Sequence, residues 1–183
     1  MYTSIGRNSV GPSGAATLAA AHLPALQELD LGDNSVGDAG VASLVAVRWP
    51  LLRVLGLCLN GLGPEAAASL CDAAARFPAL QELNLDGNEL GPAGAAALAA
   101  ARFPALQKLY IDGNSLGDAG AAALAAAHLP ALEELSLKYN VGPEGKAALA
   151  AADFPHLQKF YFEKEEEEDS EEEEDVSGTQ ILF

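Results

Sequence analysis

The chain has 183 residues, half of them hydrophobic, and a formal net charge of -16. This length supports one domain with its own buried core, which excludes a chain that is disordered throughout. The acidic balance argues against nucleic acid and anionic membranes as partners, because binding to phosphates needs clustered Lys and Arg. Basic proteins are the partners that the charge favours.

Most of the negative charge lies near the carboxyl end. Residues 163–175 hold eleven acidic residues and one lysine, so the remainder carries a net charge of only -6. Cys58 and Cys71 are too few for a disulfide framework or a zinc site, and the first residues contain no apolar run of signal-peptide length. We therefore expect a cytoplasmic or nuclear protein.

The first predicted element is a short strand that contains Thr3 and Ile5. It lacks the leucine that precedes the later strands, and an uncovered end of a stack of repeats is costly. Three outcomes are open: residues 1–7 fray, the chain self-associates through this end, or it is a fragment of a longer repeat protein.

Five more short strands are predicted, each within the pattern Leu-x-x-Leu-x-Leu-x-x-Asn. The last two apolar positions alternate with other residues, as a short strand requires. The apolar positions are Leu26, Leu29, Leu31; Leu52, Leu55, Leu57; Leu80, Leu83, Leu85; Leu106, Leu109, Ile111; and Leu132, Leu135, Leu137.

An asparagine follows each strand at a nearly constant period. The spacing is 26 residues except for one of 28, which reflects two extra residues around Cys71 and Asp72. A fixed period in this range predicts stacked supersecondary units. The asparagines are Asn8, Asn34, Asn60, Asn88, Asn114 and Asn140.

A helix is predicted after each asparagine turn. Proline suits the first helical position, and Asp38 and Asp118 place negative charge near the amino ends of two helices. Alanine, the best helix former, surrounds one inward leucine per helix, and a proline then ends each unit. The inward residues are Leu18, Leu44, Leu70, Leu98, Leu124 and Leu149.

Together these units resemble leucine-rich repeats of the ribonuclease-inhibitor type. The resemblance implies an α/β fold over residues 1–164: a right-handed leucine-rich-repeat solenoid, or horseshoe, with parallel strands on the concave side and helices on the convex side. In that family the asparagine side chain bonds the backbone of adjacent turns, so the six asparagines are expected to form a structural ladder.

The stack is predicted to end where an acidic run begins. Leu157, Phe160 and Phe162 start a further strand, but Glu165 stands where the next asparagine belongs. Dense like charges repel one another and stay solvated, so residues 165–183 are expected to form an acidic, disordered tail. A solubilising role and a contact for a basic partner both remain open.

Residues that alternate with the inward leucines are expected to line the concave sheet face. In the carboxyl-terminal half this face combines lysine with tyrosine, a common side chain in protein interfaces. The candidate partner-binding residues are Glu82, Asn84, Asp86, Lys108, Tyr110, Asp112, Glu134, Ser136, Lys138, Tyr139, Lys159 and Tyr161. The alternative is a solvated face with incidental tyrosines.

The sequence does not point to an enzyme. His22, His128 and His156 recur at the same helix-to-strand turn, and neither cysteine has a histidine or basic partner in the pattern. No phosphate-binding glycine loop with a following lysine occurs. We expect no cofactor, metal or small-molecule substrate.

The leading hypothesis is a protein-interaction module. The order of repeats and acidic segment also resembles the Ran GTPase-activating proteins, which implies a small GTPase as partner. That family carries an arginine two residues before the helix leucine, and alanine stands there in every unit, which argues against activation by this chain: Ala16, Ala42, Ala68, Ala96, Ala122 and Ala147. An inhibitor that wraps an enzyme, as ribonuclease inhibitor does, is a third possibility, although its namesake is cysteine-rich.

Overall fold

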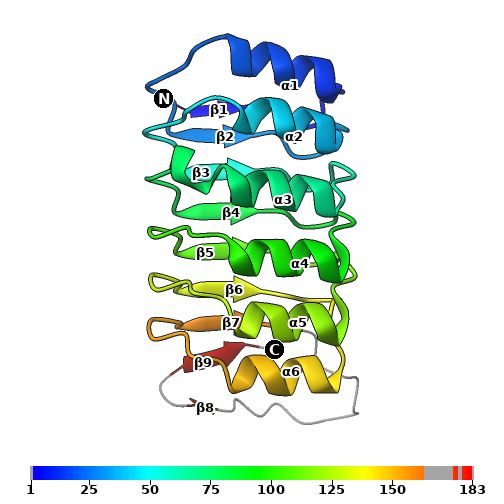
Figure 1. Ribbon diagram of the computed structural model, residues 1–183, viewed down its shortest axis with the longest axis vertical. Coiled ribbons are helices and arrows are strands. Elements are labelled where there is room, and N and C mark those ends of the chain that lie inside the picture. The colour runs from blue at the N-terminus through cyan, green and yellow to red at the C-terminus, as the bar shows by residue number, and fades with distance from the viewer. Residues whose placement is uncertain (1, 163–174, 177–178, 183) are drawn as a thin grey trace.

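The computed structural model describes residues 2–162, 175–176 and 179–182. Figure 1 shows a stack of units in which each of the first six short strands is followed by a helix on one side of the sheet. The strands are β1 (Tyr2–Ser4), β2 (Glu28–Asp30), β3 (Val54–Gly56), β4 (Glu82–Asn84), β5 (Lys108–Tyr110), β6 (Glu134–Ser136) and β7 (Lys159–Tyr161). The helices are α1 (Gly11–Ala20), α2 (Gly37–Val45), α3 (Pro64–Asp72), α4 (Gly91–Ala100), α5 (Gly117–Ala125) and α6 (Pro143–Ala150).

Strands β1 to β7 form one open parallel sheet in sequence order. Equivalent residues of successive units face one another: Leu29 pairs with Leu55, Leu55 with Leu83, and Leu83 with Leu109. This register puts all inward leucines on one side of the sheet and their neighbours on the other, because side chains alternate along a strand. The predicted solenoid is confirmed.

The core lies between the sheet and the helices. All fifteen predicted strand positions from Leu26 to Leu137 are buried, as are the helix leucines from Leu44 to Leu149. Leu18 of α1 is only half-buried and packs against this core from the first unit. Burying one leucine contributes about 2 kcal/mol, so repetition supplies the cohesion that each thin unit lacks alone.

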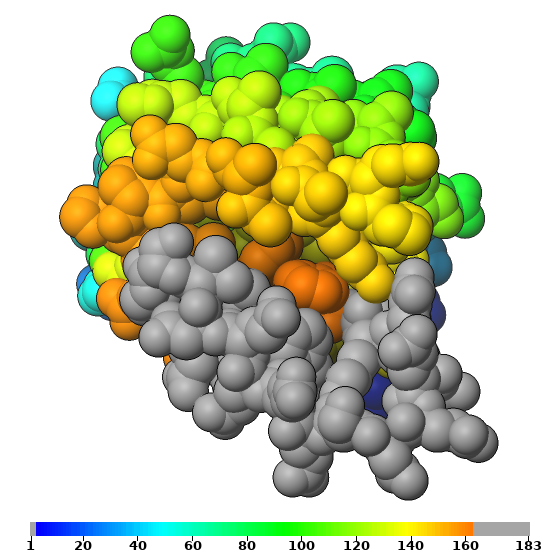
Figure 2. Space-filling model, turned by 90° about the horizontal axis from the view of Figure 1, so that it is seen from below, coloured from blue at the N-terminus to red at the C-terminus, as the bar shows by residue number. Residues whose placement is uncertain are grey.

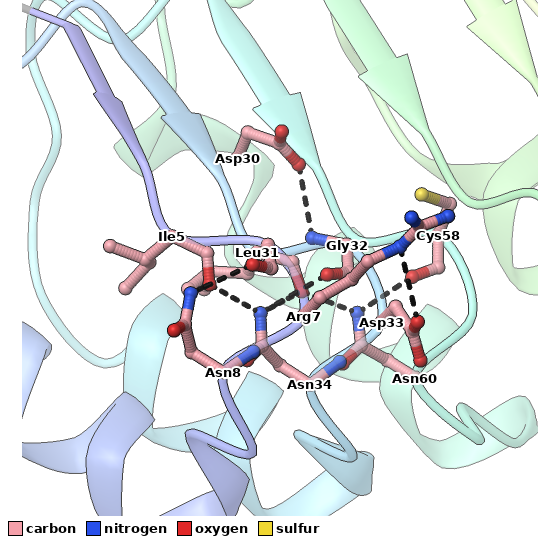
Figure 3. Close-up of polar contacts among 11 residues, drawn as sticks. Ile5, Arg7, Asn8, Asp30, Leu31, Gly32, Asp33, Asn34, Cys58 and Asn60 are labelled. Atoms are coloured by element: carbon pink, nitrogen blue, oxygen red, sulfur yellow. Dashed lines mark hydrogen bonds and ion pairs between the residues drawn. The ribbon is translucent and has the colours of Figure 1, made fainter.

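The asparagines join successive units through their side chains. The Asn60 Oδ1 atom accepts hydrogen bonds from the backbone N–H groups of Asn34 (3.1 Å) and Val36 (3.0 Å) in the preceding unit, and its amide donates to the Leu31 and Cys58 carbonyls. Figure 3 shows this arrangement for the first three units. Asn34, Asn60, Asn88, Asn114 and Asn140 are buried, whereas Asn8 is exposed.

The 28-residue unit contains a short 3-10 helix, η1 (Ala74–Arg76), which takes up its extra residues. The Arg76 side chain donates to the Val45 carbonyl at 2.8 Å, and the Trp49 backbone N–H donates to the Arg76 carbonyl at 3.1 Å. The insertion therefore packs back onto the second unit and leaves the strand register unchanged.

The two ends differ in part from expectation. Residues 2–4 pair with β2, although fraying of residues 1–7 is one predicted outcome. Within the expected disordered tail, β9 (Thr179–Leu182) pairs in parallel with β7 and β8 (Asp175–Val176) pairs with β9. The sequence Thr-Gln-Ile-Leu suits a strand and follows the acidic run, so the expectation of disorder is not met at these six residues.

The rest of the expected tail, residues 165–174, 177, 178 and 183, lies outside the described residues. Figure 2 shows this end of the stack from below, where α6 and β7 (yellow and orange) form the last layer of the repeat stack.

Candidate functional site

The sheet face, defined as the surface of strands β1 to β7 that points away from the helices, carries a row of alternating charges. Glu82, Lys108, Glu134 and Lys159 are direct neighbours across β4, β5, β6 and β7. Ion pairs join Lys108 to Glu82 at 3.4 Å and Lys159 to Glu134 at 3.7 Å. The row is thus neutral, and each of its charges has an ion-pair partner.

Two tyrosines of the next row pack against these charges. The Tyr110 hydroxyl donates to Glu134 Oε1 at 3.0 Å. Burial, followed by this hydrogen bond, raises the pKa of Tyr110, so the phenol stays protonated. The Lys138 ammonium lies 5.2 Å from the Tyr161 ring centroid, within cation–π range.

Aspartates at the ends of the strands link neighbouring units. Asp86 Oδ1 accepts the backbone N–H of Asp112 at 2.7 Å, and Asp112 Oδ1 accepts both the Ser136 hydroxyl (2.6 Å) and the Lys138 backbone N–H (2.7 Å). Burial raises the pKa of Asp86 to about 6, and the hydrogen bond from Asp112 opposes that shift. These bonds stiffen the loops that follow the strands, which we call the loop edge of the sheet face.

The loop position before each ladder asparagine has a left-handed backbone in every unit. Gly87 and Gly113 suit it, but Leu59 (φ 54°) and Tyr139 (φ 60°) do not, because a bulky side chain makes this conformation costly. Both side chains are also exposed, Leu59 by 54% and Tyr139 by 69%. Strain and an exposed apolar surface coincide here, which is typical of functional positions.

The structure brings most of the predicted site residues together. Glu82 contacts Lys108, and Glu134 contacts both Tyr110 and Lys159. Asp112 contacts Asp86, Ser136 and Lys138. Asn84 joins this set because its Oδ1 atom accepts the Asp86 backbone N–H at 2.9 Å. Lys138 reaches Tyr161, and Tyr139 lies at the loop edge.

Sequence reasoning missed Leu59, which lies on the same loop edge. The available signal was the alignment of units on asparagine, which places Leu59 where Gly87 and Gly113 stand in later units. A leucine in a position that glycine occupies in two other units marks a side chain kept in spite of its backbone conformation.

Catalytic chemistry finds little support in the described part of the chain. His22, His128 and His156 are exposed at separate turns, and burial raises the pKa of the Cys58 and Cys71 thiols, which lowers their reactivity. No group of three or more metal-binding side chains occurs among the described residues. None of the described helices has the length and apolarity needed to cross a bilayer.

Comparison with known proteins agrees with the geometry. The family model described as "Leucine Rich repeat" matches residues 22–45, 78–99 and 104–125, which correspond to three of the structural units. No significant match was found among curated proteins. Three matched repeats, together with the parallel strands β1 to β7 of one open sheet that alternate with helices, show that the chain folds as a leucine-rich-repeat solenoid.

Proposed function

We propose that the chain is a protein-interaction module that binds its partner on the sheet face over β4 to β7 and on the adjoining loop edge. Leucine-rich repeats are generally binding scaffolds, and this half of the face offers two tyrosines among paired charges. Tyr110 donates a hydrogen bond to Glu134, and the Tyr161 ring lies beneath the Lys138 ammonium. Rigid aromatic side chains lose little entropy on binding and are common at the centres of interfaces.

The observation that carries the proposal is Tyr139. Its side chain is 69% exposed and its backbone lies in the left-handed region at φ 60°. Folding alone gains little from an exposed ring in such a conformation. A binding role accounts for both features, since the cost would be recovered when the ring is buried against a partner.

Replacing Tyr139 with glycine tests this proposal. Glycine accepts the left-handed conformation without steric cost, so the free energy of unfolding is expected to stay the same or rise by about 1 kcal/mol. Recovery of the partner is expected to fall at least about tenfold if the ring is a hot spot. Urea denaturation gives the first quantity, and quantitative affinity capture from cell extract gives the second.

Leu51→Ser is the matched control. Leu51 is also an exposed apolar side chain, at 49%, but it lies in the turn after α2, away from the sheet face. Its replacement should leave capture unchanged. Equal capture by wild type, Tyr139→Gly and Leu51→Ser would remove the loop edge from the binding site.

Regulation of a small GTPase remains the alternative that the sequence resemblance raises. The alanines two residues before the helix leucines, such as Ala42 and Ala96, are exposed on the helices and supply no guanidinium for GTP hydrolysis. A direct assay separates the alternatives: hydrolysis of GTP by a Ran-like protein should be unchanged at micromolar concentrations of this chain.

A further inference from the structure

Strand β3 carries the smallest side chains of the sheet face between two rows of larger polar ones. Val54, Gly56 and Cys58 form this low region, which we call the β3 strip. Strands β2 and β4 flank it and lie about 10 Å apart, twice the spacing of paired strands. The flanking residues are Glu28 and Asp30 on β2 and Glu82, Asn84 and Asp86 along β4.

On the β2 side, the carboxylate of Asp30 is held over the strip. Its Oδ1 atom accepts the Gly32 backbone N–H at 3.0 Å and its Oδ2 atom accepts the Ser4 hydroxyl at 3.0 Å. A Cβ atom on Gly56 would lie 2.8 Å from Asp30 Oδ1, so glycine leaves the space that the carboxylate occupies. Figure 3 shows Asp30 and Cys58 on either side of Gly32.

On the β4 side, Asp86 stands beside Cys58. Burial, and then the negative charges of Asp30, Asp86 and Asp33, raise the pKa of the Cys58 thiol. Several carboxylates therefore act on one point of the strip. Arg7 offsets Asp33 at the outer edge, where the two side chains lie 3.5 Å apart.

The charges of the two halves of the face are balanced differently. Among the described residues, ion pairs between β4 and β7 neutralise Glu82 and Glu134. Asp86 has no ion-pair partner there, although the positive charge of Lys138 acts on it. Glu28 and Asp30 have no ion-pair partner in the described part of the chain. The strip thus combines a small apolar floor with unneutralised carboxylates, which is a surface complementary to a long cationic side chain.

We propose that the β3 strip receives a lysine or arginine side chain from an extended basic segment of the partner protein, with the cationic group between Asp30 and Asp86. The aliphatic stem of that side chain lies on Val54, because the Asp30 carboxylate already covers Gly56. This inference rests on the proposed binding function, but it concerns the strip between β2 and β4, shares only Asp86 with the β4 to β7 site, and can fail independently.

Other occupants fit the strip less well. The described residues contain no group of three or more side chains spaced to hold a metal ion. An acidic segment would be repelled, and a purely apolar one would desolvate Asp30 and Asp86 without pairing them, which is costly.

Cys58 allows a direct test with the protein as it stands. In a Cys71→Ser background, the rate of Cys58 modification is measured with a cationic (aminoethyl) and an anionic (sulfonatoethyl) methanethiosulfonate, each divided by its rate with a free thiol. The thiolate forms a mixed disulfide and methanesulfinate leaves. We expect the cationic reagent to be favoured at least about tenfold, and the double variant Asp30→Asn, Asp86→Asn to abolish most of that preference.

A peptide then tests the partner chemistry. A hexapeptide with arginine and glycine in alternation should protect Cys58 from neutral N-ethylmaleimide, and the same peptide with glutamate in place of arginine should not. The double variant should lower protection by the arginine peptide at least about tenfold, because two charge-assisted contacts are lost. Asparagine keeps the acceptor atoms that bind the Gly32 and Asp112 backbone, so the variant should remain folded.

Glu144→Gln is the matched control, because Glu144 is an exposed acid in the first turn of α6. It should change neither measurement. The proposal is overturned if the glutamate peptide protects Cys58 as well as the arginine peptide does, or if calcium chloride alone protects it as well as the arginine peptide. It is also overturned if the double variant keeps the preference of Cys58 for the cationic reagent. A loss of capture in Tyr139→Gly alongside any of these results would leave the function of the β4 to β7 half standing.

Discussion

At the residue scale, one asparagine per unit joins successive units through buried hydrogen bonds. Asn60 accepts two backbone N–H groups of the preceding unit and donates to two carbonyls, all in a buried position. A buried donor left unpaired costs about 1 to 3 kcal/mol, whereas the same loss at an exposed residue is offset by water. Position along the stack therefore sets what each asparagine contributes.

Asn60→Ala should lower the free energy of unfolding by about 3 kcal/mol, because the Asn34 and Val36 backbone groups lose their acceptor. Asn8→Ala is the control. Its exposed side chain donates only within its own turn, to the Ile5 and Gly6 carbonyls, so the loss should stay below about 1 kcal/mol. Urea denaturation measures both, and equal losses would contradict the ladder as the joint between units.

Asp86 predicts an effect of pH on stability. Its pKa is raised to about 6 in the folded chain from 3.8, so folding favours the protonated form. The stability that this group contributes is present below about pH 4 and is lost as the pH rises through about 6.

Asp86→Asn keeps the acceptor for the Asp112 N–H and removes the titration. We expect the variant to be more stable than wild type at pH 7.5, by about 1 kcal/mol after allowance for solvent screening, and the difference to shrink below pH 4. Thermal unfolding between pH 4 and pH 7.5 tests this, and a variant that is less stable at pH 7.5 would refute the assignment.

At the element scale, two helices are capped by their neighbours. Helices α3 and α6 begin after Gly63 and Gly142, which have no capping side chain of their own. Asp118 of α5 accepts the N–H groups of Gly142 and Gly145 at 2.8 Å, and Asp38 of α2 accepts that of Gly63 at 2.8 Å. The sequence predicts both aspartates near helix starts, but it does not show that they serve the following helix, because that depends on the packing of adjacent units.

Asp118→Ala should therefore increase amide hydrogen exchange at the start of α6 more than in α5, where the residue itself lies. The hydrogen bonds from Gly145 and Gly142 lower the pKa of Asp118. The stability that this cap contributes is therefore present at pH values above the ordinary pKa of aspartate and is lost as the pH falls through the lowered pKa. Exchange followed by mass spectrometry measures the effect. Faster exchange confined to α5 would show that the cap acts only within its own helix.

At the scale of the whole molecule, the repeat made most of the fold predictable. One period of leucine, asparagine, glycine and proline specifies strand, turn and helix, and successive units then have one consistent way to stack. The candidate sheet-face residues also followed from alternation around inward positions such as Leu83 and Leu109. Departures from the period were harder to predict, because η1 and β9 arise from segments that no other unit repeats.

The residues of the candidate site could be predicted from the sequence, but not which of their charges are paired. Alternation places Lys108 and Glu82 on the same face, but their 3.4 Å ion pair depends on register between strands 26 residues apart. The strain at Leu59 depends on a backbone angle that a single unit does not reveal. The sequence therefore located the surface, and the structure showed which of its charges are already paired.

The most direct test of the binding face is site-specific photo-crosslinking. Benzoylphenylalanine replaces Lys108 at the centre of the sheet face in one variant and Ala96, an exposed residue of α4, in another. Irradiation in cell extract is expected to join a partner protein to the chain from position 108 and not from position 96. Crosslinks of equal yield at both positions, or from position 96 alone, would contradict recognition through the sheet face.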